Sequence, residues 1–540
     1  MSLSHYQLAS NSSSYESLIN QFAPILTNRI QVLNESKYKN KIKIAIIGSG
    51  LGGCAAAYFL ENVFNAMNNK EIEIHIYEKE TELGNTTSKF QYNGLTYDVN
   101  PIKVDESQNY MNNFIKNSSC KLSNDIDENI LTALFDSSGI VVQKYGQFNK
   151  IDNLKILLVK FGIRNALKFL KIFYELFKYR TRIYSLQDQG YTFDSIEKLV
   201  RKINPLIFTL SQQTFSENIK KTNSKLIEEL SILSCLDELS QTNRVPGLVG
   251  CNSLISFFSS NFIKDDLKKI LKYLLNNCFR TKLYLNRHVK SISYDTKNNQ
   301  KNVLIYSRKS QDFKKLYDYV VVAFPLTKNL QNFNLDILYR DFLDCELVKT
   351  NSYIIDGVFT MLSPKNEERR FKLYTQDPSL KFNSIKTCSP IEGDQKNSIL
   401  YSVSSLSDLN ESIFDSVFEK GWKCVRKMST FVAPLYKKVR YSHTPFPQVI
   451  IDDVKRSRVF YLNGLHWLAC SKESNCISAR NIAFLIARKE FGEKMFSKNF
   501  GSVAKYSEET KSCTKKLNNF FLITFFTSVC TFLLYKNLNF

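Results

Sequence analysis

The sequence predicts an α/β protein whose central parallel sheet is assembled from segments far apart in the chain. Lys41–Ile47 alternates charged and apolar residues and ends in a β-branched run, which is typical of a buried parallel strand. Similar apolar runs predict further strands over Glu71–Tyr77, Tyr317–Phe324 and Arg458–Leu462. Strand, turn and helix follow one another at both ends of the chain. This alternation favours the α/β class, with the remaining residues inserted between the pieces of the sheet.

A glycine-rich turn follows the first strand and indicates what the sheet binds. Residues 48–53 read GSGLGG and carry G-x-G-x-x-G, and Cys54–Leu60 then opens a helix of small and apolar residues. Gly48 permits the tight turn, Gly50 lets the backbone approach a pyrophosphate, and Gly53 lets helix and strand pack closely. The unsatisfied N–H groups at the helix start supply the anion site.

Glu78 ends the second strand, where an acidic residue can accept a hydrogen bond from a ribose hydroxyl. It lies 25 residues after Gly53, somewhat beyond the usual spacing of about 20, and the Asn-rich turn Asn65–Lys70 accounts for the excess. A bare glycine motif is weak evidence. Between two strands and before a helix, it predicts a dinucleotide-binding Rossmann-like domain. The alternative is a glycine-rich turn in an unrelated α/β domain.

Length and composition exclude several classes of protein. A chain of 540 residues exceeds one typical core, and 43% hydrophobic residues exclude a disordered protein. The net charge of +22 permits attraction to a membrane or to nucleic acid, or lysines spread over a solvated exterior. We expect no nucleic-acid partner because no recognition motif occurs. The twelve cysteines show no zinc-ligand spacing, so no metal site is expected.

The two ends of the chain differ in character. The first 40 residues are polar at the start and lack the basic and apolar regions of a signal peptide. Near the other end, Phe520–Tyr535 is uncharged and mostly apolar, between Lys515-Lys516 and Lys536. Such a helix is about 24 Å long, shorter than the usual span of about 20 residues, but flanking lysines or a thin bilayer can make up the deficit. We expect a membrane anchor here; a buried terminal helix is the alternative.

The middle of the chain predicts helices followed by strands. From Met111 to about Leu239 the pattern is helical. Within it, apolar residues recur at intervals of three and four residues over Leu154–Leu186, with lysines and arginines between them. That stretch fits a helix packed on the core, a helix hairpin broken near Gly162, or a basic face against lipid headgroups.

The following segments predict one more helix, several strands and a second lobe. Another helix is expected over Leu254–Asn277, and strands over Thr281–Asp295 and Asn302–Ser307. A short hairpin is expected between turns at Leu83–Asn85 and Tyr92–Gly94. Residues from about 345 to 450 mix short strands with polar loops.

The chain resembles the prenylcysteine oxidase family, flavoproteins related in fold to the glutathione-reductase and amine-oxidase flavin domains. The resemblance covers about residues 40–500. Its most specific part is the closing segment, through Tyr461–Gly464, Glu473, Ile477, Asn481 and Ala483. The segments that carry the resemblance are IAIIGSGLGGCAAAYFL, IHIYEKE, RTRIYSLQDQGYTFDSIEKLV, YDYVVVAFPL and YLNGLHWLACSKESNCISARNIAFLIA.

The resemblance implies bound FAD and oxidation of a thioether. In the family, O2 oxidises prenylcysteine to cysteine, a prenyl aldehyde and hydrogen peroxide, in the breakdown of prenylated proteins. The flavin carries the redox chemistry, so the protein supplies binding, orientation and an apolar channel. We therefore name no catalytic residue, and His466 is the one histidine to watch. The family is typically lysosomal and enters through a signal peptide, which a C-terminal anchor does not match.

The resemblance also implies where FAD is held. Gly48, Gly50 and Gly53 would hold the pyrophosphate, Glu78 the adenosine ribose, and the backbone of Val289 the adenine, although Val289 also fits an ordinary strand residue. Gly464 and the helix start near Glu473–Ile477 would face the second phosphate or the flavin ring. The full set of expected cofactor contacts is Gly48, Ser49, Gly50, Gly52, Gly53, Glu78, Lys79, Gly84, Val289, Gly464, Glu473 and Ile477.

The same resemblance divides the chain into units. The FAD-binding domain is expected in three parts, with a polar extension before it, two substrate regions within it, and a linker and anchor after it. These are 1–40 (polar extension), 41–105, 246–335 and 456–500 (FAD-binding), 106–245 (helical substrate region), 336–455 (second substrate lobe), 501–519 (basic linker) and 520–536 (membrane anchor).

Three loops depart from the family pattern and leave other functions open. The family has Gly-Gly-Arg where this chain has Gly84-Asn85-Thr86, and a second Gly-Gly pair is replaced by Val99–Pro101. Around Leu248–Asn252 a glutamate and a glycine are missing. These loops motivate two alternatives to an active thioether oxidase: a non-catalytic, membrane-anchored protein that binds flavin or isoprenoid, and a flavin oxidoreductase of another substrate class.

Overall fold

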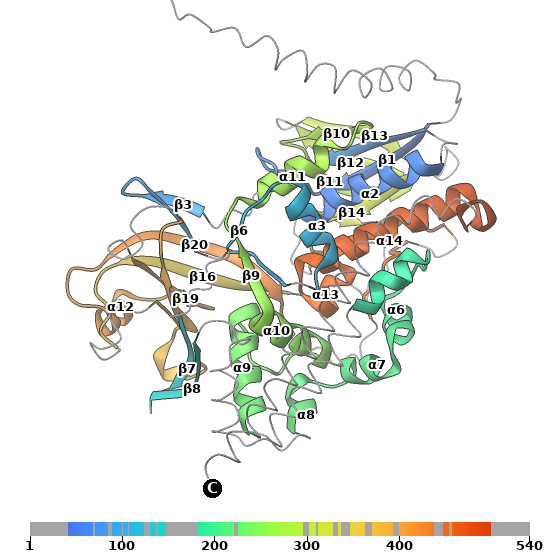
Figure 1. Ribbon diagram of the computed structural model, residues 1–540. Coiled ribbons are helices and arrows are strands. Elements are labelled where there is room, and N and C mark those ends of the chain that lie inside the picture. The colour runs from blue at the N-terminus through green and yellow to red at the C-terminus, as the bar shows by residue number, and fades with distance from the viewer. Residues whose placement is uncertain are drawn as a thin grey trace, which may run out of the picture.

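The chain folds around two sheets that lie in separate bodies (Figure 1). The computed structural model describes residues 41–67, 71–84, 89–99, 101–105, 107–123, 130–136, 139–145, 181–220, 225–294, 302–308, 311–327, 333–335, 346–361, 370–391, 399–436, 446–452 and 456–497. The first body carries a five-stranded parallel sheet, and the second carries a seven-stranded, mainly antiparallel sheet.

The five-stranded sheet has the order β10-β2-β1-β14-β21, and every pairing in it is parallel. Its strands are β1 (Ile42–Ile47), β2 (Ile72–Tyr77), β10 (Thr281–Tyr284), β14 (Tyr319–Val322) and β21 (Val459–Tyr461). The prediction that early, middle and late segments form one parallel sheet is thereby confirmed.

Both faces of this sheet are covered, which explains the apolar runs in its strands. Ile44 and Ile46 point to a core shared with the helices, while Ala45 and Ile47 point to a core shared with a second sheet. The helices on the first face are α2 (Leu51–Met67), α3 (Asn109–Asn117), α6 (Ile196–Ile203), α11 (Leu267–Asn276) and α14 (Lys472–Phe491). The second sheet comprises β11 (His288–Tyr294), β12 (Asn302–Arg308), β13 (Gln311–Tyr317) and β15 (Asn334–Leu335).

The seven-stranded sheet has the order β20-β16-β19-β18-β17-β7-β8, and only the β17–β7 pairing within it is parallel. Its strands are β7 (Leu131–Asp136), β8 (Gly139–Tyr145), β16 (Leu347–Asp356), β17 (Phe371–Tyr374), β18 (Ser384–Cys388), β19 (Leu400–Ser405) and β20 (Lys423–Pro434). The short helices η3 (Pro378–Leu380) and α12 (Glu411–Val417) lie in its connections.

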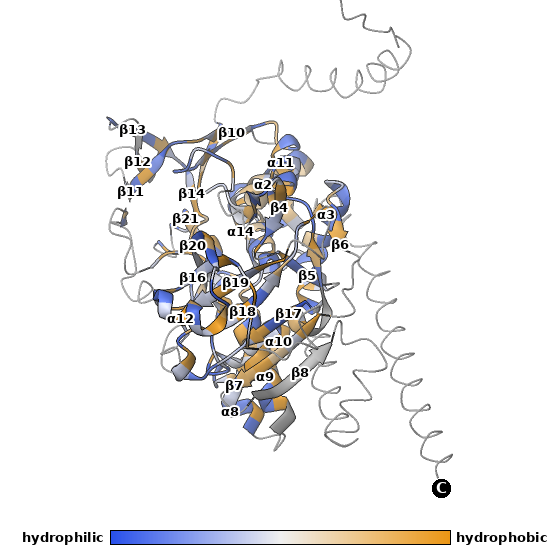
Figure 2. Cartoon of the chain, turned by 90° about the vertical axis from the view of Figure 1, so that its left-hand side faces the viewer, coloured by the Kyte–Doolittle hydropathy of each residue, from blue (hydrophilic) through white to orange (hydrophobic). Residues whose placement is uncertain are grey.

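A helical layer packs against one end of the seven-stranded sheet. Helices α9 (Lys225–Leu239) and α10 (Gly247–Ser259) are largely hydrophobic in Figure 2, and their buried side chains form a core with Leu134 of β7 and Tyr374 of β17. Further helical segments are residues 181–188, α7 (Pro205–Ser211), α8 (Phe215–Lys220), α13 (His466–Ala469) and the 3₁₀ turn η4 (Leu462–Gly464).

Two small sheets complete the described fold. Strands β3 (Lys89–Tyr92) and β4 (Leu95–Asp98) form a hairpin, and β9 (Ser260–Ile263) pairs with both β5 (Lys103–Asp105) and β6 (Leu122–Ser123). The hairpin turns at Asn93-Gly94, where both residues have positive φ, as a two-residue hairpin turn requires. The expected hairpin therefore exists, but it is centred on the second predicted turn rather than lying before it.

Two helical predictions were wrong. The region from Met111 to Leu239, expected to be helical, also contains β6, β7 and β8. Residues 131–135 of β7 are all buried, and a short, fully buried strand has no alternation that distinguishes it from a helix. The single helix predicted over Leu254–Asn277 is broken by β9, and the Asp266 carboxylate then caps α11 by accepting from Lys268 N at 2.9 Å.

Some predictions fall outside the described residues. They concern the first 40 residues, most of the amphipathic stretch Leu154–Leu186, and the apolar run Phe520–Tyr535. Within the part of the chain that the structure describes, no helix combines the length and the apolar character needed to cross a bilayer.

Candidate functional site

The glycine turn after β1 has the geometry that its sequence predicts. Gly48 adopts a φ of +104°, and its N–H donates to the carbonyl of Tyr77 at 2.8 Å, which ties the turn to β2. Cys54 N donates to Gly50 O at 3.0 Å and begins the helical hydrogen bonding of α2. A Cβ on Gly53 would lie 2.0 Å from the carbonyl oxygen of Gly48, so only glycine allows this close contact between turn and helix.

Gly50 differs from its neighbours because it faces open space. A Cβ built on Gly50 would have no atom within 4 Å, whereas one on Gly52 would lie 2.5 Å from Leu462 Cδ2. Gly52 therefore serves packing against the closing segment, and Gly50 borders space that a ligand can enter. The first turn of α2 carries no acidic residue, so no side chain of that turn repels a phosphate.

Glu78 lies beside this turn and holds it. Its carboxylate accepts hydrogen bonds from both the N–H and the hydroxyl of Ser49, each at 2.8 Å, and the side chain is buried. Its other oxygen accepts from Glu80 N at 3.1 Å. The acidic residue and the glycine turn are therefore in contact. Lys79 points the other way: its side chain is exposed and pairs with Glu80 at 3.5 Å.

Val289 and Gly84, two of the predicted cofactor contacts outside this turn, have different surroundings. Arg287 N donates to Glu78 O at 2.7 Å, which brings the start of β11, and with it buried Val289, next to the end of β2. Gly84 has a φ of +59°, and a Cβ there would lie 2.3 Å from Leu271 Cδ1. Gly84 thus serves close packing against α11.

The closing segment reaches the same edge of the sheet through β21 and η4. A Cβ on Gly464 would lie 3.1 Å from Gln448 O, and Leu462 contacts Gly52 of the glycine turn. Helix α14 then starts at Lys472, where the Ser471 hydroxyl accepts from Ser474 N at 3.2 Å. The structure therefore brings the first and last predicted cofactor segments together.

Glu473 and Ile477 connect α14 to other elements. The buried Glu473 carboxylate accepts from the backbone N–H groups of Tyr110 and Met111, at 2.8 and 2.9 Å, and from the hydroxyl of Tyr184 at 2.7 Å. The carbonyl of Ile477 accepts from Gln187 Nε2 at 2.9 Å. Sequence reasoning missed these partners because no local signal links residues more than 280 positions apart.

His466 begins α13 beside the closing segment. Its Nδ1 lies 3.4 Å from Ser471 O, and its Nε2 lies 4.0 Å from Cys470 Sγ. Burial lowers the pKa of His466 to about 4, with a smaller contribution from Lys472. The imidazole is therefore neutral near pH 7. Among the described residues, no group of three or more acidic, histidine or cysteine side chains is arranged to hold a metal ion.

These features fit a bound dinucleotide. The open side of Gly50 and the start of α2 provide a pyrophosphate cradle next to Glu78, an acceptor for ribose. The arrangement includes no nucleophile paired with a base, so a bound cofactor would have to supply the redox chemistry.

Comparisons with known proteins agree with this geometry. Residues 46–117 match a model of the NAD(P)-binding Rossmann-like domain. Mouse prenylcysteine oxidase 1 is 23% identical over 465 residues, which cover 82% of this chain and 88% of the mouse protein. The human protein is also 23% identical with the same coverage, and bovine prenylcysteine oxidase 1-like is 22% identical over 82% of this chain and 90% of its own length.

Solved structures support the fold alone, because their sequence identities are low. A triple mutant of putrescine oxidase has a TM-score of 0.52 at 12% identity and covers 83% of this chain and 100% of its own. A fatty acid isomerase from P. acnes has a TM-score of 0.51 at 14% identity, with 83% and 98% coverage. The family model described as prenylcysteine lyase matches residues 147–497, about two thirds of the sequence. The chain therefore belongs to the prenylcysteine lyase family.

Proposed function

We propose that this protein is an FAD-dependent oxidase that cleaves the thioether of prenylcysteine. The observation that carries the proposal is the family match over residues 147–497, which follows an intact dinucleotide motif at residues 48–53. The reaction consumes the thioether, O2 and water, and it yields cysteine, a prenyl aldehyde and hydrogen peroxide. Two electrons and two protons leave the thioether for O2, and water supplies the aldehyde oxygen.

We propose that three parts of the chain hold FAD, which supplies the two-electron acceptor when bound. The turn at residues 48–53 and the N-terminus of α2 bind the pyrophosphate through backbone N–H groups. Glu78 accepts from the adenosine ribose, and the backbone of Val289 flanks the adenine. Gly464 and the start of α14 near Glu473 face the second phosphate or the ring. The chain itself binds and orients both partners.

Anaerobic reduction of the flavin tests this proposal. The full-length protein, purified in detergent and loaded with FAD, is expected to lose its visible flavin absorption when S-farnesylcysteine is added without oxygen. Admitting air should restore the absorption and release hydrogen peroxide. S-dodecylcysteine serves as the control, because its carbon next to sulfur is not allylic.

Two other outcomes would support the alternatives. A flavin that stays oxidised with farnesyl- and geranylgeranylcysteine would contradict the oxidase proposal and favour a non-catalytic protein that binds flavin or isoprenoid. The altered loops Gly84–Thr86 and Val99–Pro101 motivate that alternative. Reduction by an amine or a carotenoid-like isoprenoid, and not by a thioether, would indicate another substrate class.

We also propose that residues 520–536 attach the enzyme to a membrane. The support lies in the sequence, an uncharged apolar run between lysines. The full-length chain is expected to float with neutral phosphatidylcholine vesicles in a density gradient, whereas a chain ending at Asn519 should stay in the dense fraction. Neutral vesicles remove the general attraction of a basic protein to anionic lipid. Equal flotation of both chains would contradict an anchor at this position.

A further inference from the structure

The N-terminal ends of the parallel strands lie together at one end of the first body, opposite the glycine turn that follows β1. Helices α2 and α14, which lie side by side in Figure 1, both end here, and the ring centroids of Phe64 and Phe491 are 5.2 Å apart. Helix α11 ends here as well, because it leads directly into β10. We call this end the amino-end surface; its residues are 41–43, 61–67, 71–73, 272–282, 317–319, 456–459 and 488–497.

Phe279 is exposed on the amino-end surface. It is 58% exposed, the largest exposed fraction of any large hydrophobic residue that the structure describes. The backbone at this point is tied to α2, because the buried Glu61 carboxylate accepts from the N–H groups of Phe279 and Arg280, at 2.8 and 2.7 Å. The hydroxyl of Thr281 donates to the same carboxylate at 2.8 Å. Phe279 is therefore presented to solvent from a segment that the fold holds in place.

Most of the exposed charges on the amino-end surface are positive. Lysines make up five of its six exposed charged residues, which are Lys41, Lys272, Lys282, Lys489, Lys494 and Glu493. With the partly and fully buried side chains included, the surface holds ten basic and six acidic residues. The additional ones are Lys43, Arg280, Arg456, Arg458, Arg488, Glu61, Glu71, Glu73, Asp318 and Glu490. Lys315 and Asp452 lie beside the surface and add one charge of each sign, so the positive excess remains.

The described chain also ends at the amino-end surface. The ring of Phe496 lies 5.1 Å from the guanidinium of Arg488, which belongs to the last turn of α14, and Ser497 is the last described residue. The apolar run proposed above as a membrane anchor begins at Phe520, and 22 residues separate it from Ser497. An anchor in that run would tether the fold to a bilayer from this end.

We propose that the amino-end surface docks on an anionic lipid membrane, with Phe279 inserted among the headgroups. A lysine close to an anionic bilayer strengthens binding about fivefold, and an exposed aromatic ring gains by leaving water. The inference builds on the attachment proposed for residues 520–536 and gives the attached protein an orientation. The six residues of β1 span about 20 Å, so the glycine turn at their other end faces away from the bilayer.

Tryptophan fluorescence of the full-length Phe279→Trp variant tests this inference. On vesicles of equal parts phosphatidylcholine and phosphatidylserine, its emission is expected to shift to shorter wavelength and to be quenched by lipids brominated in their acyl chains. Leu406→Trp is the matched control, because Leu406 is 49% exposed in the connection after β19, in the other body. Its emission should not change. Wild type, which has only Trp422 and Trp467, supplies the background.

Removal of two lysines tests the electrostatic part of the inference. Lys41→Gln and Lys272→Gln, added to Phe279→Trp, should weaken docking about 30-fold, the product of about fivefold for each lysine. Both side chains are exposed, so the fold should be unaffected. High salt should have the same effect on the protein without these two changes, because it screens exposed charges. Docking that survives both treatments would contradict the role given to the lysines.

The outcomes separate the docking surface from the anchor. Quenching on anionic vesicles by a protein that does not float with neutral phosphatidylcholine would support the surface and contradict the anchor. A protein that floats without quenching of Phe279→Trp, or that binds neither kind of vesicle, would overturn the inference. A fluorescence change with heparin and none with vesicles would also overturn it, because the surface would then bind a polyanion other than a membrane.

Discussion

Replacing Gly50 by alanine is expected to yield a folded protein that has lost most of its affinity for FAD. The added Cβ meets no protein atom within 4 Å, and the φ of Gly50 lies outside the left-handed range, so the chain tolerates the substitution. The methyl group instead occupies the space through which a pyrophosphate approaches the backbone. We expect FAD affinity to fall about 100-fold, equivalent to about 2.7 kcal/mol, with an unchanged circular dichroism spectrum and apoprotein melting temperature.

Gly53→Ala is the contrasting variant in the same turn. Its Cβ would lie 2.0 Å from the carbonyl oxygen of Gly48, which belongs to the backbone and cannot rotate away. We expect Gly53→Ala to destabilise the apoprotein by about 3 kcal/mol, at the upper end of overpacking costs. Flavin fluorescence titration together with melting curves would distinguish the two variants. If Gly50→Ala binds FAD as wild type does, the pyrophosphate does not lie at this turn.

The parts of the fold that were predictable from the sequence depend on local constraints. The turn at Gly48 and Gly53 is fixed by sterics within a few residues, and the strands of the parallel sheet are continuous apolar runs because both of their faces are buried. The contact between Glu78 and the turn follows from the adjacent positions of β1 and β2 in the sheet. For these elements the local sequence pattern and the tertiary packing favour the same secondary structure.

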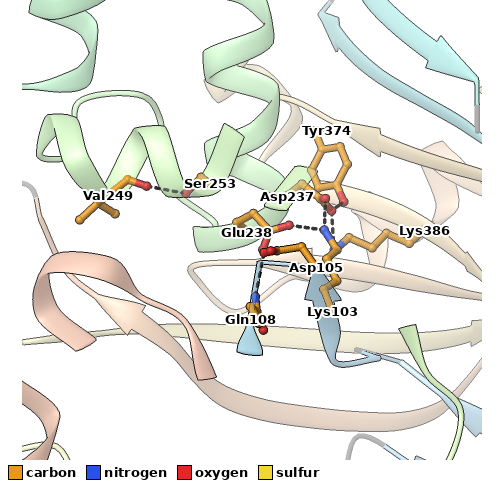
Figure 3. Close-up of polar contacts among 9 residues, drawn as sticks. All are labelled: Lys103, Asp105, Gln108, Asp237, Glu238, Val249, Ser253, Tyr374 and Lys386. Carbon is orange, nitrogen blue, oxygen red and sulfur yellow. Dashed lines mark hydrogen bonds and ion pairs between the residues drawn. The ribbon is translucent and has the colours of Figure 1, made fainter. Parts of the chain in front are cut away.

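The parts that were not predictable depend on partners far away in the chain. Strand β7 pairs with β17, more than 200 residues later in the chain, and β9 pairs with β5 and β6. These distant pairings favour a strand where the local pattern does not. Lys103 of β5 pairs with Asp237 and Glu238 of α9, and Lys386 of β18 lies 4.0 Å from Asp237 (Figure 3). In the sequence these residues look like ordinary surface lysines and acids.

Glu473 could stabilise the fold or contact FAD, and its hydrogen bonds favour the structural role. It was predicted to lie near the second phosphate or the flavin ring, and its carboxylate accepts three hydrogen bonds from α3 and Tyr184. An anion at the N-terminus of α3 satisfies otherwise unpaired N–H groups and interacts favourably with the helix dipole. The start of α14 can therefore support FAD binding without direct contact from this side chain.

Glu473→Ala is accordingly expected to destabilise the protein even in the absence of FAD. The substitution leaves the buried N–H groups of Tyr110 and Met111 without an acceptor, at a cost of about 3–5 kcal/mol. We expect the melting temperature of the apoprotein to fall by about 6–20 °C, at about 2–4 °C per kcal/mol for a domain of about 150–250 residues. Glu473→Gln keeps one acceptor oxygen and should show a smaller decrease.

The matched control and a titration with FAD decide between the two roles of Glu473. Glu411 also lies in the first turn of a helix but is exposed, so Glu411→Ala should change the stability by no more than about 0.5 kcal/mol. If Glu473 acts through α3, the decrease in melting temperature is the same in apoprotein and in protein saturated with FAD. If the carboxylate contacts the cofactor, the apoprotein melts as wild type does and only the stabilisation by FAD is reduced, because a ligand stabilises the folded state more when it binds more tightly.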